Sequence, residues 1–300
     1  MADSILDLTK KRVVLLDGGM GTELIRLGLP QGECPELWNV EKPEIIQEVH
    51  GSYFEAGSDA VLTNSFGGSA IKLSFYGLER RCYELNFEAA RIAKDVKPED
   101  RFVGGSMGPT GKFLQPFGEY TEEEFEKAYA EQAKGLMEGG VDFLLIETQY
   151  DIKEALCALR VAKRVTSLPV FVTMTFKLTP RGFFTIMGNS VAQCIQELEV
   201  GGVSALGTNC TLNSAEMVDL VRIMRKITSL PLIAQANAGQ PEVTSDGRVN
   251  YSQDVEDYVR HIPQMISNGV DIIGGCCGTN PEYIRRMAEL VRSNTNTTIS

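Results

Sequence analysis

Apolar residues fall in eight short runs along the chain, and few polar residues interrupt each run. Continuous runs of this length indicate strands that are buried on both faces, as in a parallel sheet covered by helices. The segments between the runs show helical spacing instead, as at Phe125, Tyr129 and Ala133. The predicted strands are residues 13–16, 60–63, 102–105, 143–146, 170–174, 204–207, 232–235 and 270–274.

The boundaries between these elements repeat in form. In four places a helical segment ends in a glycine, which suits a left-handed helix cap, and an apolar run follows. These places are residues 55–62, 138–145, 199–206 and 267–273. Pro43 and Pro281 stand at first helical positions. Capping boxes are predicted at Thr121 with Glu124, Asp151 with Glu154, and Ser190 with Gln193.

Eight strands that alternate with helices predict the α/β class, in the form of a (β/α)8 TIM barrel. A doubly wound open sheet is the alternative, but no Gly-x-Gly-x-x-Gly motif follows the first strand. No stretch rich in Pro, Gly or Ser divides the chain, so residues 1–300 are predicted to form a single domain. We expect residues 239–251 to be a long loop and residues 293–300 to be a frayed tail.

Composition and charge narrow the class of partner. The 300 residues are 43% hydrophobic and 23% charged, and the formal net charge is -11. That charge argues against nucleic acid or an anionic membrane as partner, because both favour basic patches. No apolar signal-peptide core and no run of about 18 apolar residues is present, which predicts a cytoplasmic protein. Seven cysteines in a reducing compartment are thiols, metal ligands or nucleophiles rather than a disulfide framework.

Three of the cysteines follow predicted strands. Cys276 and Cys277 follow the eighth strand, and Cys210 follows the sixth. Active sites of such barrels lie at the carboxyl ends of the strands, so the three thiols are expected to meet there. Three thiolates and one open position fit a tetrahedral zinc that binds an exogenous ligand. The alternatives are three buried thiols, or a redox pair formed by Cys276 and Cys277.

The remaining cysteines and the histidines are weaker candidates for metal ligands. Cys34, Cys82, Cys157 and Cys194 lie away from strand ends, and the last three fall in helical patterns as small buried hydrophobes. His50 and His261 also fall in helical patterns and are interpreted as surface residues or core residues with hydrogen-bond partners. A zinc held by thiolates alone activates a bound thiol for alkyl transfer rather than water for hydrolysis.

Two acidic residues also end apolar strands, Asp17 after the first and Glu147 after the fourth. An unpaired buried carboxylate is costly, so these positions need a partner. Together with nearby glycine amides they suit a zwitterion, with its ammonium on the acids and its carboxylate on the amides. The alternative is that each carboxylate caps or pairs within the protein.

The motifs at the strand ends resemble those of the homocysteine S-methyltransferase family, over residues 13–290. That family includes the homocysteine-binding module of cobalamin-dependent methionine synthase. The resemblance implies that Cys210, Cys276 and Cys277 hold zinc and that homocysteine sulfur becomes its fourth ligand. The motifs are Asp17-Gly18-Gly19, Thr63-Asn64-Ser65-Phe66-Gly67, Gly108-Pro109-Thr110-Gly111, Glu147-Thr148, Asn209-Cys210, Asn237-Ala238-Gly239 and Gly274-Gly275-Cys276-Cys277-Gly278.

The resemblance also implies a substrate site. Asp17 and Glu147 would bind the homocysteine amino group, the amides around Gly18 and Gly19 would bind its carboxylate, and Asn64 belongs to the same site. Asn237 matches a family asparagine that approaches zinc when substrate is absent. One departure is visible in Gln235-Ala236-Asn237, where many relatives have a proline before the asparagine.

The predicted function is therefore methyl transfer to L-homocysteine, giving methionine. Residues 108–116 look most similar to the methionine synthase module, which favours methylcobalamin, or a corrinoid protein acting in trans, as donor. A piece of a longer enzyme is equally compatible. S-methylmethionine and S-adenosylmethionine are the alternative donors; betaine is disfavoured, because Trp38 is the only tryptophan for an aromatic pocket. Another thiol acceptor, or a zinc- or redox-sensing barrel without enzyme activity, remains an alternative.

Overall fold

Each predicted apolar run forms a strand in the computed structural model, which describes residues 4–243 and 249–295. The eight strands form one sheet in the order β1-β12-β9-β8-β5-β4-β3-β2, and the paired neighbours are parallel. The predicted (β/α)8 barrel is therefore confirmed. The strands are β1 (Val14–Leu15), β2 (Ala60–Leu62), β3 (Phe102–Met107), β4 (Phe143–Gln149), β5 (Val170–Met174), β8 (Ala205–Asn213), β9 (Leu232–Asn237) and β12 (Ile272–Gly275).

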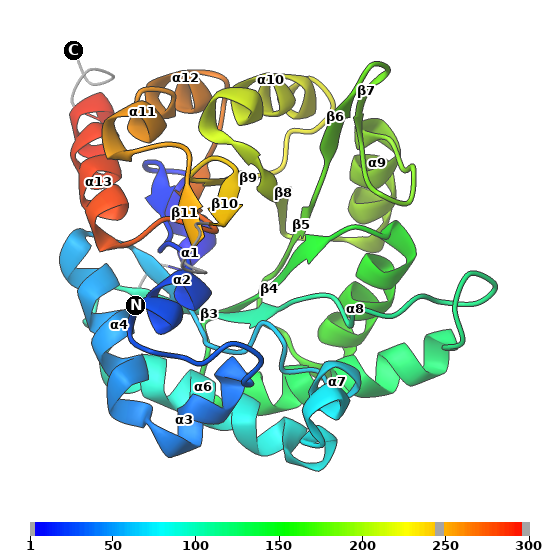
Figure 1. Cartoon of the computed structure of the whole chain (residues 1–300). Helices are drawn as coiled ribbons and strands as arrows, with labels where there is room; N and C mark the ends of the chain where they lie inside the picture. The colour runs from blue at the N-terminus through cyan, green and yellow to red at the C-terminus, as the bar shows by residue number, and fades with distance from the viewer. Residues whose placement is uncertain (1–3, 244–248, 296–300) are drawn as a thin grey trace.

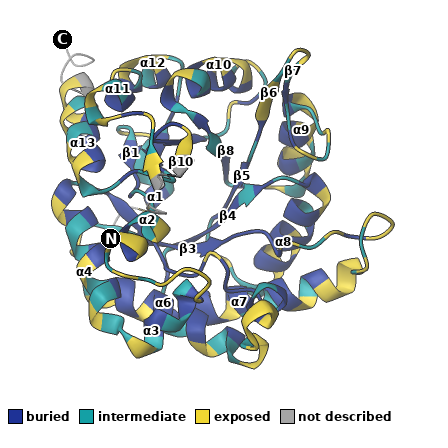
Figure 2. Cartoon of the chain, viewed as in Figure 1, coloured by how far each residue is buried: buried dark blue, intermediate teal, exposed yellow. Residues whose placement is uncertain are grey.

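The helices form a ring around these strands (Figure 1). Their inner sides are buried and their outer sides exposed, as amphipathic spacing predicts (Figure 2). The helices of the described residues, of which α1 lies at the lower end of the barrel rather than in the ring, are α1 (Ile5–Thr9), α2 (Met20–Arg26), α3 (Trp38–Glu41), α4 (Pro43–Ala56), α5 (Ala70–Leu73), α6 (Cys82–Asp95), α7 (Glu122–Gly139), α8 (Ile152–Val165), α9 (Val191–Gly201), α10 (Ser214–Arg225), α11 (Val255–Val259), α12 (Ile262–Ser267) and α13 (Pro281–Thr295). Three short 3-10 turns lie at Pro35–Leu37, Ser74–Tyr76 and Glu79–Arg81.

The barrel interior is filled by apolar side chains at its lower and middle levels. Phe143 and Phe171 pack there with ring centroids 4.8 Å apart, among other fully buried residues of the strands. Ile5 of α1 joins the same cluster, so α1 closes the lower end of the barrel. With the lower end filled, the open space for chemistry lies at the carboxyl ends of the strands.

The barrel closes between β1 and β2 with the help of two aspartate side chains. The Asp59 N–H donates to the Leu15 carbonyl at 2.7 Å, and Asp59 Oδ2 accepts from the Leu15 N–H at 2.9 Å. Higher up the same seam, Asp17 Oδ2 accepts from the Leu62 N–H at 2.8 Å. Side-chain carboxylates thus take positions that backbone carbonyls hold in an ordinary ladder.

Asp59 also carries an ion-pair cluster at the lower end of the seam. Its two oxygens accept from both Arg12 amino groups, at 2.6 and 2.7 Å, and from Arg101 at 2.5 Å. The carboxylate is only 4% exposed, so these partners stabilise a charge that has little contact with water. Arg12, Asp59 and Arg101 precede β1, β2 and β3, and the cluster therefore ties three strand starts together.

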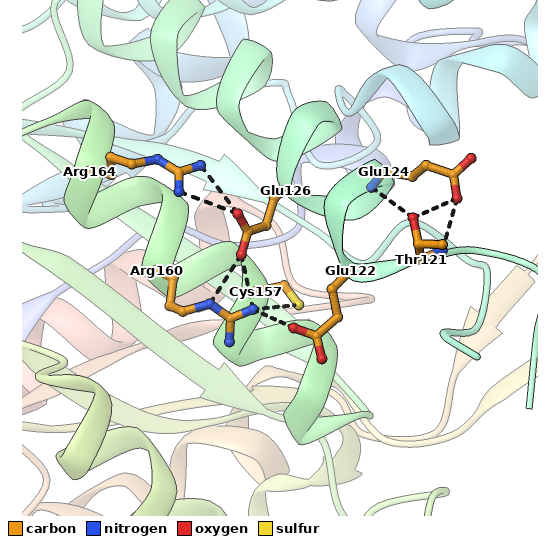
Figure 3. A network of polar contacts seen from close by, with 7 residues as sticks. All are labelled: Thr121, Glu122, Glu124, Glu126, Cys157, Arg160 and Arg164. Atoms are coloured by element: carbon orange, nitrogen blue, oxygen red, sulfur yellow. Dashed lines mark hydrogen bonds and ion pairs between the residues drawn. The ribbon is translucent and has the colours of Figure 1, made fainter. Parts of the chain in front are cut away.

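The predicted N-terminal caps of α7 and α9 are present. Thr121 and Glu124 form the reciprocal capping box at the start of α7, and Ser190 caps α9 through the Gln193 N–H. Figure 3 shows the first of these beside an ion-pair network in which Arg160 of α8 contacts Glu122 and Glu126 of α7. The networked pairs are half exposed and contribute little individually.

Two of the predicted capping boxes are wrong in their second half. Ser190 caps α9, but the Gln193 side chain is hydrogen bonded to Glu197 at 2.9 Å rather than to the Ser190 N–H. Asp151 does cap α8, but through the Lys153 N–H rather than the Glu154 N–H. Glu154 turns away and accepts hydrogen bonds from the Thr110 N–H at 2.7 Å and the Tyr129 hydroxyl at 2.8 Å. These two donors stabilise the Glu154 carboxylate, because both share its buried environment.

Two hairpins were not foreseen. The expected loop 239–251 contains the antiparallel pair β10 (Pro241–Val243) and β11 (Val249–Tyr251), and residues 244–248 between them lie outside the described part. The second hairpin, β6 (Lys177–Thr179) and β7 (Gly182–Phe184), follows β5. Three-residue strands carry too little alternation to stand out in a sequence. Of the expected tail, residues 293–295 belong to α13, and 296–300 lie outside the described residues.

The two histidines differ from expectation in one respect. His50 is fully buried in α4, and neither ring nitrogen has a hydrogen-bond partner. Burial lowers the pKa of His50 to about 3, so the ring is a neutral core residue without polar contacts. His261 is partly buried just before α12. Among the described helices, none is long and apolar enough to cross a membrane.

We expect Asp59→Ala to lower the free energy of unfolding by about 3–5 kcal/mol, because it leaves two partly buried guanidinium groups without their carboxylate. Urea denaturation followed by circular dichroism measures the change. The matched control is Asp219→Ala, which removes an exposed pair with Arg222 and should cost less than about 1 kcal/mol. Equal losses in the two variants would contradict the role of Asp59 at the seam.

Candidate metal centre and substrate pocket

A cavity of about 330 Å³ lies at the carboxyl ends of the strands. Its walls come from the segments after β1, β2 and β12, from residues of β3, β4, β8 and β9, and from Tyr251 of β11. Of the predicted site residues, those that line it are Asp17, Gly18, Gly19, Asn64, Glu147, Cys210, Cys276 and Cys277. The fold thus brings together residues that are up to 260 positions apart in sequence, as between Asp17 and Cys277.

The three predicted thiols form one cluster. The sulfurs of Cys210, Cys276 and Cys277 all lie within 4.8 Å of one another, and Cys210 and Cys277 are 4.0 Å apart. Tetrahedral zinc with bonds of about 2.3 Å separates its sulfur ligands by roughly 3.8 Å, so the spacing fits such an ion. All three cysteines are partly exposed, which leaves a side from which a further ligand can approach.

An unusual backbone places Cys210. Cys210 and Thr211 both have φ of 62°, in the left-handed region that side chains other than glycine rarely adopt. The pairing of β8 with β9 shifts register between Asn209 and Asn213 at this point. The bulge interrupts the regular pairing of the strand. It directs the side chain of Cys210 towards Cys277, which lies in the loop after β12. Such strain is retained where surrounding contacts fix it, and it clusters at functional sites.

A second bulge lies beside the first, on β4. Thr148 has φ of 58°, and the pairing of β4 with β5 shifts register between Ile146 and Gln149. Asn209 connects the two bulges: its Oδ1 accepts from the Thr148 N–H at 2.9 Å. Its Nδ2 donates to Glu147 Oε2 at 2.9 Å and to the Thr148 hydroxyl at 2.8 Å. Asn209 therefore fixes the backbone and the carboxylate of the fourth strand from the sixth strand of the barrel.

The charges of the thiols are unequal. Hydrogen bonds from the Cys276 and Cys277 thiols lower the pKa of Cys210, and a hydrogen bond from the Asn237 side chain lowers it further. The same contacts with Cys210 raise the pKa of Cys276 and of Cys277. Negative charge is therefore concentrated on Cys210, which has the hydrogen-bond donors.

Asp17 is fully enclosed and only half satisfied. Its Oδ2 accepts from Leu62 at the barrel seam, whereas Oδ1 is buried without a hydrogen-bond donor among the described residues. Burial raises the pKa of Asp17 well above its usual range, and the nearby Glu147 carboxylate adds to the rise. The expectation that a carboxylate here needs a partner thus holds for one oxygen and leaves the other free for a ligand.

Both carboxylate oxygens of Glu147 accept hydrogen bonds, unlike those of Asp17. The Ser106 hydroxyl donates to Oε1 at 2.5 Å, and Asn209 donates to Oε2. Burial nevertheless raises the pKa of Glu147 to about 7, against the effect of these hydrogen bonds. A ligand that brings positive charge would stabilise the ionised form of both carboxylates.

The other predicted substrate residues take different roles in the structure. The Gly19 N–H already donates to the carbonyl and the hydroxyl of Thr279, both at 3.2 Å. The Asn64 amide nitrogen donates to the Pro35 carbonyl and to Asn39, so it holds the wall of the cavity. Asn237 lies beside the thiols rather than in the cavity lining, and its Oδ1 has no donor.

Tyr251 was not foreseen as a site residue. It lies at the end of β11 and lines the cavity, and its hydroxyl contacts the Cys277 sulfur. Burial and the nearby sulfurs of the cluster raise the pKa of Tyr251 to about 12. The ring packs on Gly278, where an added Cβ would lie 2.3 Å from the ring carbon Cγ. Sequence spacing gave no signal for this contact, because it depends on the unforeseen hairpin.

Comparison with known proteins agrees with this geometry. The model of a family described as homocysteine S-methyltransferase matches residues 14–291. Methionine synthases of Mycobacterium tuberculosis and Mycobacterium leprae are 32% and 31% identical over 305 residues, covering 96% of this chain. The chain spans about a quarter (25%) of the length of those relatives.

A solved structure extends the likeness to the fold. The metallated form of the homocysteine methyltransferase MmuM from Escherichia coli superposes with a TM-score of 0.77 and 25% identity. The match covers 94% of this chain and 98% of that one.

Removing one sulfur tests the cluster directly. We expect the wild-type protein to bind about one zinc ion per chain and Cys210→Ala to lose it, because two thiols alone cannot complete the set. Metal content after gel filtration, measured by mass spectrometry, gives the stoichiometry. Cys194→Ala is the matched control, since Cys194 is a buried thiol in α9 outside the cluster. Full zinc content in Cys210→Ala would overturn the three-sulfur site.

Proposed function

This chain belongs to the homocysteine S-methyltransferase family, and from that membership we propose that it transfers a methyl group to the thiol of L-homocysteine. The observation that carries the proposal is the cluster of three cysteine sulfurs within 4.8 Å, in a cavity that also holds two buried carboxylates. The cluster suits a thiol substrate, and the carboxylates suit an amino group. Homocysteine carries both groups in one molecule.

Zinc would be held by Cys210, Cys276 and Cys277. As a Lewis acid it would keep a substrate thiol deprotonated at neutral pH. The reaction then needs no general base at the sulfur. The homocysteine sulfur forms a bond to the methyl carbon, and the bond from that carbon to the donor breaks with its electron pair leaving on the donor. The thiol proton is lost to solvent when the substrate binds.

The remaining residues of the cavity bind and orient the amino acid. Asp17 Oδ1 and Glu147 would accept hydrogen bonds from the ammonium group, with Glu147 fixed by Ser106 and Asn209. The Gly18 amide is the better candidate for the carboxylate, because the Gly19 amide is already shared with Thr279. Asn237 lies close enough to Cys210 to approach the metal when substrate is absent. The hairpin with Tyr251 would cover the site and limit the access of water.

The proposed donor is a methylcorrinoid, as methylcobalamin or on a corrinoid protein in trans. The likeness to two methionine synthases over nearly all of this chain supports it, because the motifs of this chain resemble the homocysteine-binding module of cobalamin-dependent methionine synthase. S-methylmethionine or S-adenosylmethionine is the second candidate, favoured by the match to a homocysteine methyltransferase over 98% of that protein's length.

A donor panel separates these candidates. The zinc-loaded protein is incubated with homocysteine and, in turn, methylcobalamin, S-methylmethionine, S-adenosylmethionine or betaine, and methionine is measured by mass spectrometry. We expect methionine from methylcobalamin and loss of activity after zinc removal by a chelator. Turnover with a sulfonium donor alone would replace the corrinoid proposal. Absence of methionine with every donor, while another thiol is methylated, would rule out homocysteine as acceptor.

Substitution of the two carboxylates tests recognition of the amino group. In Asp17→Asn the oxygen is expected to stay with the Leu62 N–H, which turns an NH2 donor towards the substrate. We expect Asp17→Asn and Glu147→Gln each to raise the homocysteine KM by about tenfold or more, the value of one hydrogen bond to a charged group. Zinc content should stay unchanged.

Glu154→Gln is the matched control for this pair. Glu154 is equally buried and hydrogen bonded but lies outside the cavity lining. Its substitution should leave the homocysteine KM within about twofold of wild type, because it touches no substrate atom. An unchanged KM in Asp17→Asn and Glu147→Gln would remove the amino acid from the proposal.

A further inference from the structure

Gln235 is a buried amide in the lining of the cavity. It stands on β9, is 2% exposed and lines the cavity with Asp17 and the cysteines. In the register of the sheet it pairs with Gly274 of β12, whose next residue, Gly275, donates its N–H to the Asp17 carbonyl. Gln235 and Asp17 therefore flank the same strand. A Cβ added at Gly274 would lie 3.0 Å from the Asp17 carbonyl oxygen and 3.3 Å from Gln235 Cγ.

The orientation of the Gln235 amide is fixed by its neighbour. Its Nε2 donates to the Gly275 carbonyl at 3.3 Å. A carbonyl only accepts, so the reversed amide would set two oxygens against each other. The amide oxygen Oε1 must then face away from Gly275, where it is buried and has no hydrogen-bond donor among the described residues.

The missing partner of this oxygen has to be a donor. Asp17 Oδ1, also of the cavity lining, is a second buried acceptor without a donor. The described lining contains three carboxylates, of Asp17, Glu36 and Glu147, three thiols, and no lysine, arginine or histidine. Glu36 is already engaged by the Gly67 N–H and the Cys34 thiol. Positive charge must therefore come with the ligand, and neither orphan oxygen receives a hydrogen bond from the described lining.

We propose that Gln235 Oε1 accepts a hydrogen bond from the ammonium group of the amino-acid thiol, alongside Asp17 Oδ1 and Glu147. An ammonium group has three N–H donors, and these residues supply one acceptor for each. Gln235 is neutral, so it adds an acceptor without adding a further buried charge to the anionic site. It thus makes the pocket select thiols that carry an α-amino group. The inference rests on the proposed function, because that function supplies the amino-acid thiol.

A comparison of two ligands isolates this contact. Isothermal titration calorimetry on the zinc-loaded protein gives Kd for L-homocysteine and for 4-mercaptobutyrate, which lacks only the amino group. The ratio of the two Kd values measures the preference for the amino group. Gln235→Met keeps the length of the side chain but removes the acceptor. We expect it to reduce this preference by about tenfold or more, the value of a hydrogen bond to a charged group.

Two variants control for effects on structure. Gln132→Met removes a buried amide that is built alike, with Nε2 on the Ser65 carbonyl and Oε1 without a donor, but outside the cavity lining. It should leave the preference within about twofold of wild type, since it cannot reach the ligand. Burial favours the protonated form of the carboxyl in Gln235→Glu, which can donate to the Gly275 carbonyl and keep an acceptor oxygen at the same reach, so this variant should keep the preference. If Gln235→Met does not fold, Gln235→Asn, whose shorter amide cannot reach the ammonium, takes its place.

The outcomes separate the inference from the proposed function. Suppose that homocysteine binds the wild type well and that Gln235→Met raises the Kd of both ligands by the same factor. Gln235 is then a structural residue and the inference is wrong. An unchanged ratio in Gln235→Met has the same meaning. If the wild type binds 4-mercaptobutyrate as tightly as homocysteine, the pocket does not recognise an amino group, and the proposed function fails together with the inference.

Discussion

The burial of groups that favour negative charge, without a cationic side chain in the described lining, is the constraint on which the site depends. Three carboxylates and three thiols share one small cavity, and burial raises the pKa of two of those carboxylates, Asp17 and Glu147. Such an arrangement is costly for the protein by itself and becomes favourable when ligands bring positive charge. The proposed metal cation and the proposed ammonium group would therefore both meet one electrostatic requirement.

Much of the fold could be predicted from the sequence, because buried parallel strands leave a direct trace. Each of the eight apolar runs became a strand, and Thr121, Ser190, Pro43 and Pro281 mark helix starts as expected. The failures have a common cause: short-range patterns do not show tertiary competition. Glu154 was drawn to Thr110 and Tyr129 instead of its helix start, and His50 was buried without partners. The hairpin of β10 and β11 is too short for its alternation to be recognised.

The sequence predicted one part of the candidate site and missed another part. Cysteine and carboxylate positions at strand ends predicted the residues that gather in the cavity, because strand ends of a barrel must meet. The contacts that orient them could not be predicted. Left-handed backbone at Cys210, Thr211 and Thr148 has no sequence signature, since these residue types disfavour it. Asn209 was noted only as part of a motif, yet it joins both bulges and holds Glu147. The family assignment, made from the motifs, is confirmed.

Asp17 has a consequence for how this scaffold can change over time. One of its oxygens completes the seam between the first two strands, and the other is buried without a donor and is the acceptor proposed for the substrate ammonium group. Ligand preference and barrel closure therefore draw on a single side chain, and selection on either one constrains the other. A descendant that came to prefer a thiol without an amino group would first need another hydrogen-bond acceptor for the Leu62 N–H. The order of such substitutions is thereby restricted, with a structural replacement preceding any change of specificity.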